Sequence, residues 1–170
     1  MNHVAEPPPS ALESGIWHIG WGGVDVPNEY LWWKSKGMDV HTDIYPLGTG
    51  HVTYWNGPDR ELIEINTQGH HRYSHVHLFA RDVNVTADWF TKHLGLSRPK
   101  EVPKPEDMST VRAWSSWFRC DNVNFGIYGQ PDYTPSPPWW RWEPLAELKP
   151  QQGRAIDHIA FSYRDINPVF

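Results

Sequence analysis

The stretch His75-Val-His-Leu-Phe-Ala-Arg-Asp82 decides the fold, because it occurs three times in degenerate form. His18-Ile-Gly-Trp-Gly-Gly-Val-Asp25 precedes it, and His158-Ile-Ala-Phe-Ser-Tyr-Arg-Asp165 follows it. In each copy a His stands seven residues before an Asp, with mostly apolar or aromatic residues between them. The first two copies lead into helix-like segments that end at Gly37 and Gly95. An internal repeat of this kind predicts a fold built from repeated units.

The first copy opens a unit with the element order β-α-β-β-β over residues 15–66. Ile16 to Trp21 is a short apolar strand. The helix that follows is closed by Gly37, which suits the left-handed position after a helix C-terminus. Three further strands are expected from their apolar alternation and the turn residues between them: 38–45, 51–55 and 61–66.

The second copy opens a similar unit over residues 74–130, in which one strand is not placed. His75 to Ala80 is expected to be a strand and Val85 to Leu94 a helix. Two strands of a hairpin are expected next, Val111 to Cys120 and Val123 to Tyr128. The Asp that ends each repeat copy stands where a strand passes into a helix. An Asp at that point caps the helix N-terminus, so these residues need no catalytic role.

Three segments lie outside the two units. Residues 1–14 are polar, and we expect a disordered tail or the remainder of a linker there. Residues 131–152 are rich in Pro and Trp and are interpreted as a linker, with a lid over a pocket as the alternative. Residues 153–170 are interpreted as the start of a truncated third unit, with its strand over Gly153 to Tyr163.

Composition excludes several classes of protein. The 170 residues carry 15 Lys and Arg against 20 Asp and Glu, a formal charge of -5. Because there is no basic run, neither a nucleic acid nor an anionic membrane is an expected partner. No apolar run approaches the ~20 residues of a membrane span, and residues 1–14 lack the features of a signal peptide. A cytoplasmic protein is therefore predicted. The single cysteine, Cys120, excludes an intrachain disulfide.

Aromatic residues and histidines are unusually frequent, with 11 Trp and 10 His. Such abundant Trp indicates broad aromatic packing or a lined pocket. The most informative single residue is Glu64, which stands between Ile63 and Ile65 in an expected strand. A carboxylate in that position must face water, a partner group or a metal ion.

Together, the repeat and one further motif resemble the vicinal oxygen chelate superfamily, which includes glyoxalase I, extradiol dioxygenases and bleomycin resistance proteins. Gly57-Pro58-Asp59-Arg60-Glu61-Leu62-Ile63-Glu64 is similar to the family's Asp-Pro-Asp-Gly-x-x-Ile-Glu strand. The departures are Gly57 for the first Asp and Arg60 for Gly. The resemblance covers about residues 16–170 and implies an α+β fold, in which repeated β-α-β-β-β units form a cupped mixed sheet.

The resemblance also implies a divalent metal site in the cup, with ligands from the first strand of each unit and the last strand of one or both. By position the candidate ligands are His18, Glu64 and His75, with His158 at the same place in the third copy. Residues 123–128 offer no carboxylate. This omission favours two His and one carboxylate around Fe(II), Mn(II) or Zn(II), with positions left open for substrate or oxygen.

Two pairings of the units remain open. If residues 16–66 pair with 75–129, then His18, Glu64 and His75 form one site. Some family members instead run four units in series, and in that arrangement this chain is a fragment whose His75 shares a site with His158. A homodimer that completes an unpaired unit is a further expectation.

The expected function is that of a metal-dependent enzyme acting on a small oxygenated substrate, either dioxygenase-like or glyoxalase- and lyase-like. His77 is predicted to act as a base or to line the pocket, because it shares a strand face with His75. Tyr128 is predicted to donate a hydrogen bond to an oxyanion. The alternatives are a non-catalytic protein that sequesters a small molecule, as bleomycin resistance proteins do, and an inactive fragment.

Overall fold

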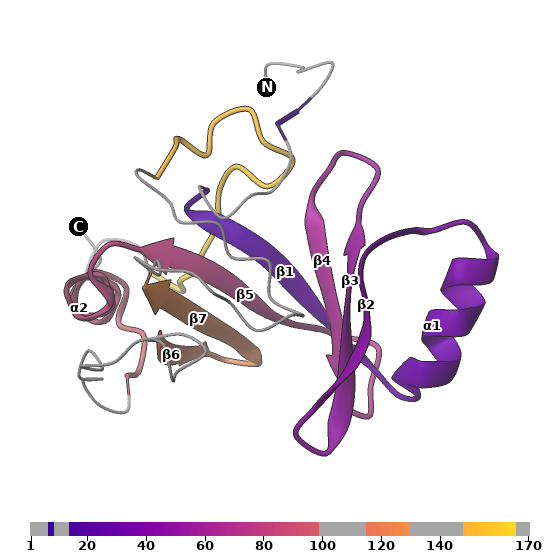
Figure 1. Ribbon diagram of the computed structural model, residues 1–170. Helices are drawn as coiled ribbons and strands as arrows, with labels where there is room; N and C mark the ends of the chain where they lie inside the picture. Colours follow the sequence, from indigo (N-terminus) through magenta and orange to yellow (C-terminus); the bar gives the residue numbers. More distant parts are fainter. Residues whose placement is uncertain (1–6, 9–13, 99–114, 130–147, 166–170) are drawn as a thin grey trace, which may run out of the picture.

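The computed structural model describes residues 7–8, 14–98, 115–129 and 148–165. Within these ranges, seven strands form one mixed sheet with the order β2-β3-β4-β1-β5-β7-β6, accompanied by two helices (Figure 1). The elements are β1 (Ile16–Gly23), α1 (Val26–Ser35), β2 (Asp39–Leu47), β3 (Gly50–Asn56), β4 (Leu62–Thr67), β5 (Tyr73–Ala80), α2 (Val83–Leu94), β6 (Ser115–Cys120) and β7 (Val123–Gly129).

The two expected units lie side by side in this sheet and join through their first strands. In the first unit β1 runs parallel to β4, and in the second β5 runs parallel to β7. The strands β1 and β5 are antiparallel neighbours at the centre of the sheet. The α+β class is therefore confirmed, and the pairing of the first unit with the second is the one that the chain adopts.

Both helices are capped as the sequence indicates, and α2 begins at Val83, two residues before the expected Val85. The side chain of Asp25 accepts from the backbone N–H of Asn28 at the start of α1, and that of Asp82 accepts from Val85 at the start of α2. Gly37 and Gly95 follow the two helices with φ of 79° and 67°. The repeated Asp residues of the first two copies are thus explained by capping.

The side chains of the sheet divide between two faces. On one face, α2 packs over a cluster that contains Val76, Leu78, Phe118 and Ile127, and α1 packs by Val26 and Tyr30 on Trp55 and Ile65. On the other face, aromatic side chains from four strands converge. The ring centroid of Trp17 lies 6.2 Å from Tyr54, 5.1 Å from Phe79 and 6.2 Å from Tyr128. Residues of both units therefore meet on this inner face, around the centre of the sheet.

The third repeat copy does not form the strand that was expected over Gly153 to Tyr163. The apolar residues of this copy pack instead on the outside of the second unit, where Ile156, Ile159 and Phe161 join its core. The rings of Phe161 and Phe125 stack with centroids 5.5 Å apart. The apolar pattern is thus satisfied by packing against a finished sheet, and no strand pairing is needed.

Several expectations fall on residues outside the described ranges. They concern most of the N-terminal tail, the beginning of the strand expected from Val111, and the Pro- and Trp-rich stretch 131–147 with its linker and lid interpretations.

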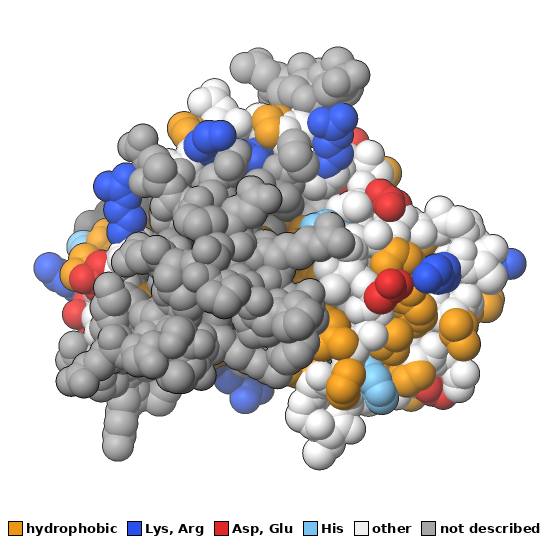
Figure 2. Space-filling view, in the orientation of Figure 1, with side chains coloured by type: hydrophobic (Ala, Val, Ile, Leu, Met, Phe, Trp, Pro, Cys, Tyr) orange, Lys and Arg blue, Asp and Glu red, His pale blue; other side chains and the backbone are white. Residues whose placement is uncertain are grey.

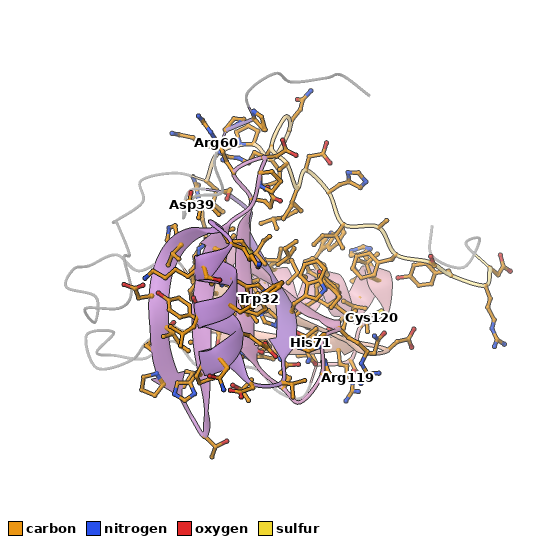
Figure 3. All side chains as sticks on the ribbon, turned by 90° about the vertical axis from the view of Figure 1, so that its right-hand side faces the viewer. Trp32, Asp39, Arg60, His71, Arg119 and Cys120 are labelled. Carbon is orange, nitrogen blue, oxygen red and sulfur yellow. The ribbon has the colours of Figure 1, made fainter. Side chains whose placement is uncertain are left out.

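The surface of the described residues mixes chemical types. Figure 2 shows acidic, basic and hydrophobic side chains interspersed over the half of the molecule that carries α1, β2 and β3. The outer face of α1 exposes Leu31 and Trp32, and Trp32 faces the viewer in Figure 3. No helix among the described residues is long and apolar enough to span a membrane.

Candidate metal centre

Four side chains with metal-ligating atoms gather on the inner face of the sheet. His18 comes from β1, Glu64 from β4, and His75 and His77 from β5. One potential ligand atom of each lies within 4.8 Å of those of the others. All four residues are buried, with exposed fractions of 0 to 5%. Because buried ionisable groups are costly unless they are paired or bind a metal, the cluster needs a physical explanation.

Strand register brings the four together. His18 lies opposite His77, and Gly20 lies opposite both His75 on one side and Glu64 on the other. The absence of a side chain at Gly20 is essential, because the ring of His75 fills that space. A Cβ on Gly20 would lie 2.0 Å from Cε1 of His75, far inside van der Waals contact.

Glu64 is held as a carboxylate by two hydrogen bonds. The hydroxyl of Tyr54 donates to Oε2 at 2.7 Å, and the amide of Asn66 donates to Oε1 at 2.8 Å. Burial alone would raise the pKa of Glu64, but the short contacts to His18 and His75 outweigh burial and hold this pKa well below its ordinary value. Glu64 is therefore an anion at neutral pH, and the interpretation as a solvent-facing residue is wrong.

His75 is oriented by Ser74. The hydroxyl oxygen of Ser74 lies 2.7 Å from Nδ1 of His75 and 3.2 Å from the carbonyl oxygen of Gly20. The tautomer of His75 decides whether Nδ1 donates to the Ser74 oxygen or accepts from it. On the other side of the ring, Nε2 of His75 faces Oε1 of Glu64 at 3.4 Å, buried and without a hydrogen bond.

His18 and His77 are buried with their ring nitrogens unsatisfied. Neither nitrogen of either ring has a hydrogen-bond partner. Nε2 of His18 approaches Oε2 of Glu64 to 3.0 Å, an ion-pair distance that does not meet hydrogen-bond geometry. Burial lowers the pKa of His18 and, more strongly, the pKa of His77. Both imidazoles are therefore neutral near pH 7, which is the form that binds a metal ion.

Aromatic side chains surround the cluster. The ring centroid of His77 lies 4.8 Å from that of Tyr128 and 5.0 Å from that of Trp117, and Trp17 contacts His18 edge-on at 4.3 Å. Burial raises the pKa of Tyr128, so its hydroxyl remains protonated and able to donate. The cluster is thus a polar centre within an apolar, aromatic surrounding, as in most small-molecule sites.

The structure brings together three of the four predicted ligands, His18, Glu64 and His75. His77, predicted to be a base or to line the pocket, lies among them, and Tyr128 lies beside His77; the catalytic roles of both stay predictions.

His158 is the exception among the predicted ligands. His158 is exposed and contacts Asp157. It lines a groove together with Val76 and Phe125. The side chains of those two residues lie on the outer face of the sheet, opposite the face that carries the cluster. The structure does not bring His158 into the cluster, because its copy of the repeat forms no strand of the sheet.

Sequence reasoning did not find the residues that support the cluster: Gly20, Tyr54, Asn66 and Ser74. Of these, Gly20, Asn66 and Ser74 carried a cue, since each lies within two residues of a predicted ligand on the same strand. Tyr54 had none, because its contact with Glu64 depends on the register between β3 and β4.

Solved structures provide the comparison for the architecture. No family model and no curated protein matches the sequence. Among solved structures, glyoxalase I from Zea mays matches with a TM-score of 0.56 and 17% identity over 72% of this chain. The match covers 44% of the maize chain, so this sequence spans less than half the length of that protein. Methylmalonyl-CoA epimerase from Streptomyces coelicolor matches with a TM-score of 0.47 and 14% identity, over 68% of this chain and 96% of that one.

The chain therefore has the fold of the vicinal oxygen chelate superfamily, to which glyoxalase I belongs. The fold expected from the repeat and from the Gly57–Glu64 motif is confirmed. On this fold the chain carries a buried cluster of His and Glu residues that could hold a metal ion.

Proposed function

We propose that His18, Glu64 and His75 bind a divalent metal ion and that the chain is a metal-dependent enzyme. The observation that carries this proposal is the convergence of two buried imidazoles on one buried carboxylate. Nε2 of His18 and Nε2 of His75 lie 3.0 and 3.4 Å from the oxygens of Glu64, and neither nitrogen has a hydrogen bond. A metal ion bound by these three residues would satisfy both nitrogens and the carboxylate.

The donor set fits a transition metal better than calcium or magnesium. Imidazole nitrogen suits zinc and iron, whereas magnesium and calcium prefer sites built wholly from oxygen. We propose Fe(II), Mn(II) or Zn(II). When bound, such an ion supplies a Lewis acid that polarises two adjacent oxygens of a small substrate.

The residues around the cluster supply orientation and exclude water. Tyr54 and Asn66 fix the carboxylate of Glu64, and Ser74 fixes the ring of His75, as groups behind metal ligands commonly do. Tyr128, whose ring lies beside that of His77, would donate from its protonated hydroxyl to an anionic oxygen of the substrate. The aromatic rings of Trp17 and Trp117 provide apolar contact for its carbon skeleton.

The first experiment is metal analysis of protein purified without chelator and then loaded with Fe(II), Mn(II) or Zn(II). We expect near-stoichiometric metal in the wild type and almost none in Glu64→Ala or His75→Ala. His158→Ala is the matched control, since it removes an exposed histidine from the same repeat motif, and it should bind metal as the wild type does. Equal loading of wild type and Glu64→Ala would refute the proposed site.

Turnover then separates the reaction types. Cleavage of a catechol with uptake of oxygen by the Fe(II)-loaded protein would identify a dioxygenase, whereas isomerase or lyase activity would be independent of oxygen.

A protein that sequesters an aromatic ligand is the second candidate, supported by the rings of Trp17, Tyr54 and Phe79 on the inner face. Such a protein does not need Glu64 or its histidine neighbours. Absence of metal under all loading conditions, together with quenching of tryptophan fluorescence by a planar aromatic compound, would favour this second function. We also propose a homodimer, and a strict monomer in analytical ultracentrifugation would exclude it.

A further inference from the structure

The two units place different residues at equivalent positions around the cluster. In the first unit, Gly20 on β1 lies opposite Glu64 on the parallel strand β4. In the second unit, His77 on β5 lies opposite Gly126 on the parallel strand β7. Gly20 and His77 each stand two residues after the first histidine of their repeat copy. Gly20 therefore corresponds to His77, and Glu64 corresponds to Gly126.

Gly126 stands where the second unit would carry its own carboxylate, and the imidazole of His77 lies in the space beside it. A Cβ built on Gly126 would lie 2.9 Å from Cδ2 of His77, closer than side chains approach one another. It would also lie 3.1 Å from the rings of Trp117 and Tyr128. A side chain on β7 at this point and the present position of the His77 ring are therefore incompatible.

His77 has the properties of a ligand. Its ring centroid is 4.2 Å from that of His18 and 4.6 Å from that of His75. Both of its nitrogens are buried and lack a hydrogen-bond partner. Leaving a buried polar atom unpaired is costly, and a bond to a metal ion would satisfy one of these two nitrogens.

We infer that His77 is the fourth protein ligand of the metal ion and replaces the carboxylate that β7 lacks. The inference rests on the proposed metal centre and deepens it. The site then consists of three imidazoles and one carboxylate, which leaves a divalent ion with a net charge of +1. Because imidazole suits zinc and iron while carboxylate and water suit manganese, this donor set favours Zn(II) and Fe(II) over Mn(II).

The ligand count can be measured directly by X-ray absorption spectroscopy of the zinc-loaded protein. We expect three imidazoles around zinc in the wild type and two in His77→Gln, which preserves a polar side chain at that position. Two imidazoles in the wild type would overturn the inference, and this outcome does not depend on the stability of any variant.

A ligand swap between β5 and β7 provides an independent test. Zinc affinity, measured by competition with a chelator, should fall at least tenfold in His77→Ala. The double variant His77→Ala/Gly126→Glu should recover most of that loss and shift metal preference toward Mn(II). Gly126→Glu alone should bind zinc weakly, because the new side chain displaces the ring of His77.

Circular dichroism and the midpoints of urea unfolding first establish that each variant folds. His158→Ala serves as the control variant, whose affinity for zinc should equal that of the wild type. Wild-type affinity in a folded His77→Ala would overturn the inference, and so would a folded double variant without recovery. A wild type that binds no metal would refute the proposed metal centre itself. Metal lost in Glu64→Ala but kept in His77→Ala would refute only the fourth ligand.

Discussion

The two units of the sheet share one scaffold but contribute different chemistry to its centre. In each unit the repeated motif begins with a His on the first strand, and an Asp caps the helix that follows. The last strand of each unit runs parallel to its first strand. The first unit contributes one imidazole, His18, and the carboxylate of Glu64. The second contributes two imidazoles, His75 and His77, and has Gly126 in place of a carboxylate.

This difference shows that ligand positions on such a scaffold are coupled in pairs of opposed residues. Two rings of the cluster occupy space over a glycine on a neighbouring strand: His75 lies over Gly20 of the other unit, and His77 lies over Gly126 of its own unit. The places of these two rings therefore depend on residues that lie outside the histidine motif itself.

The largest effect on this arrangement is expected from Gly20→Ala. The new Cβ would lie within 2.5 Å of three ring atoms of His75, so the ring must leave the cluster. We expect zinc affinity to fall at least tenfold, equivalent to about 1.4 kcal/mol. Isothermal titration calorimetry with zinc measures this change.

Gly15→Ala is the matched control for that substitution. Its Cβ would meet only the Gln151 side chain, at an ordinary 3.9 Å, and the affinity for zinc should remain unchanged. If Gly20→Ala bound zinc as tightly as this control does, the coupling between Gly20 and His75 would be disproved.

An intermediate effect is expected in the pH dependence of the metal-free protein. Burial holds the pKa of His77 well below its ordinary value of 6.5, so the folded state keeps this ring neutral while the unfolded chain takes up a proton below pH 6.5. Stability therefore falls as the pH drops below that value. His18 acts in the same direction. Glu64, whose pKa is also lowered, loses its contribution only at still lower pH, below its unfolded value of 4.5.

The slope of stability with pH is set by the number of protons that the protein takes up on unfolding. Substitution of His77 by Gln should lower that number by about one. Urea unfolding of chelator-treated wild type and variant from pH 8 to pH 5 measures the difference. We expect the wild type to lose more free energy of unfolding than the variant between pH 6.5 and pH 5. Parallel curves for the two proteins would show that His77 is not buried in its neutral form.

Much of the fold was predictable because local patterns determine it. The His-to-Asp repeat located β1 and β5, and turn and capping residues located both helices. The candidate site was predictable in part, since His18, Glu64 and His75 occupy matching places in repeated motifs. His158 was not separable from them by sequence, because whether a repeat copy joins the sheet depends on the strands available to pair with it.

The role of Gly126 was also beyond sequence reasoning. Nothing local to Gly126 indicates that it faces His77, because that fact depends on the parallel register of β5 and β7. The lack of a carboxylate in residues 123–128 was visible, but the residue that fills the space was not.

The smallest expected effect concerns the turns that lead into the last strand of each unit. Arg60 before β4 and Asp121 before β7 both have positive φ, 67° and 50°, and Figure 3 shows Arg60 in its turn. Left-handed backbone costs residues with a Cβ about 1–2 kcal/mol, and Asp tolerates it better than most because its short side chain can bond locally. Glycine removes that cost but gives the unfolded chain more freedom, which offsets part of the gain.

Arg60→Gly should therefore raise the free energy of unfolding by about 0.5–1 kcal/mol, and Asp121→Gly by less. Glycine is also the residue that the family motif carries at the position of Arg60. Urea denaturation of both variants, with chelator present so that metal binding does not contribute, measures the two changes. An unchanged or lowered free energy of unfolding in Arg60→Gly would show that the positive φ at Arg60 costs the folded chain little.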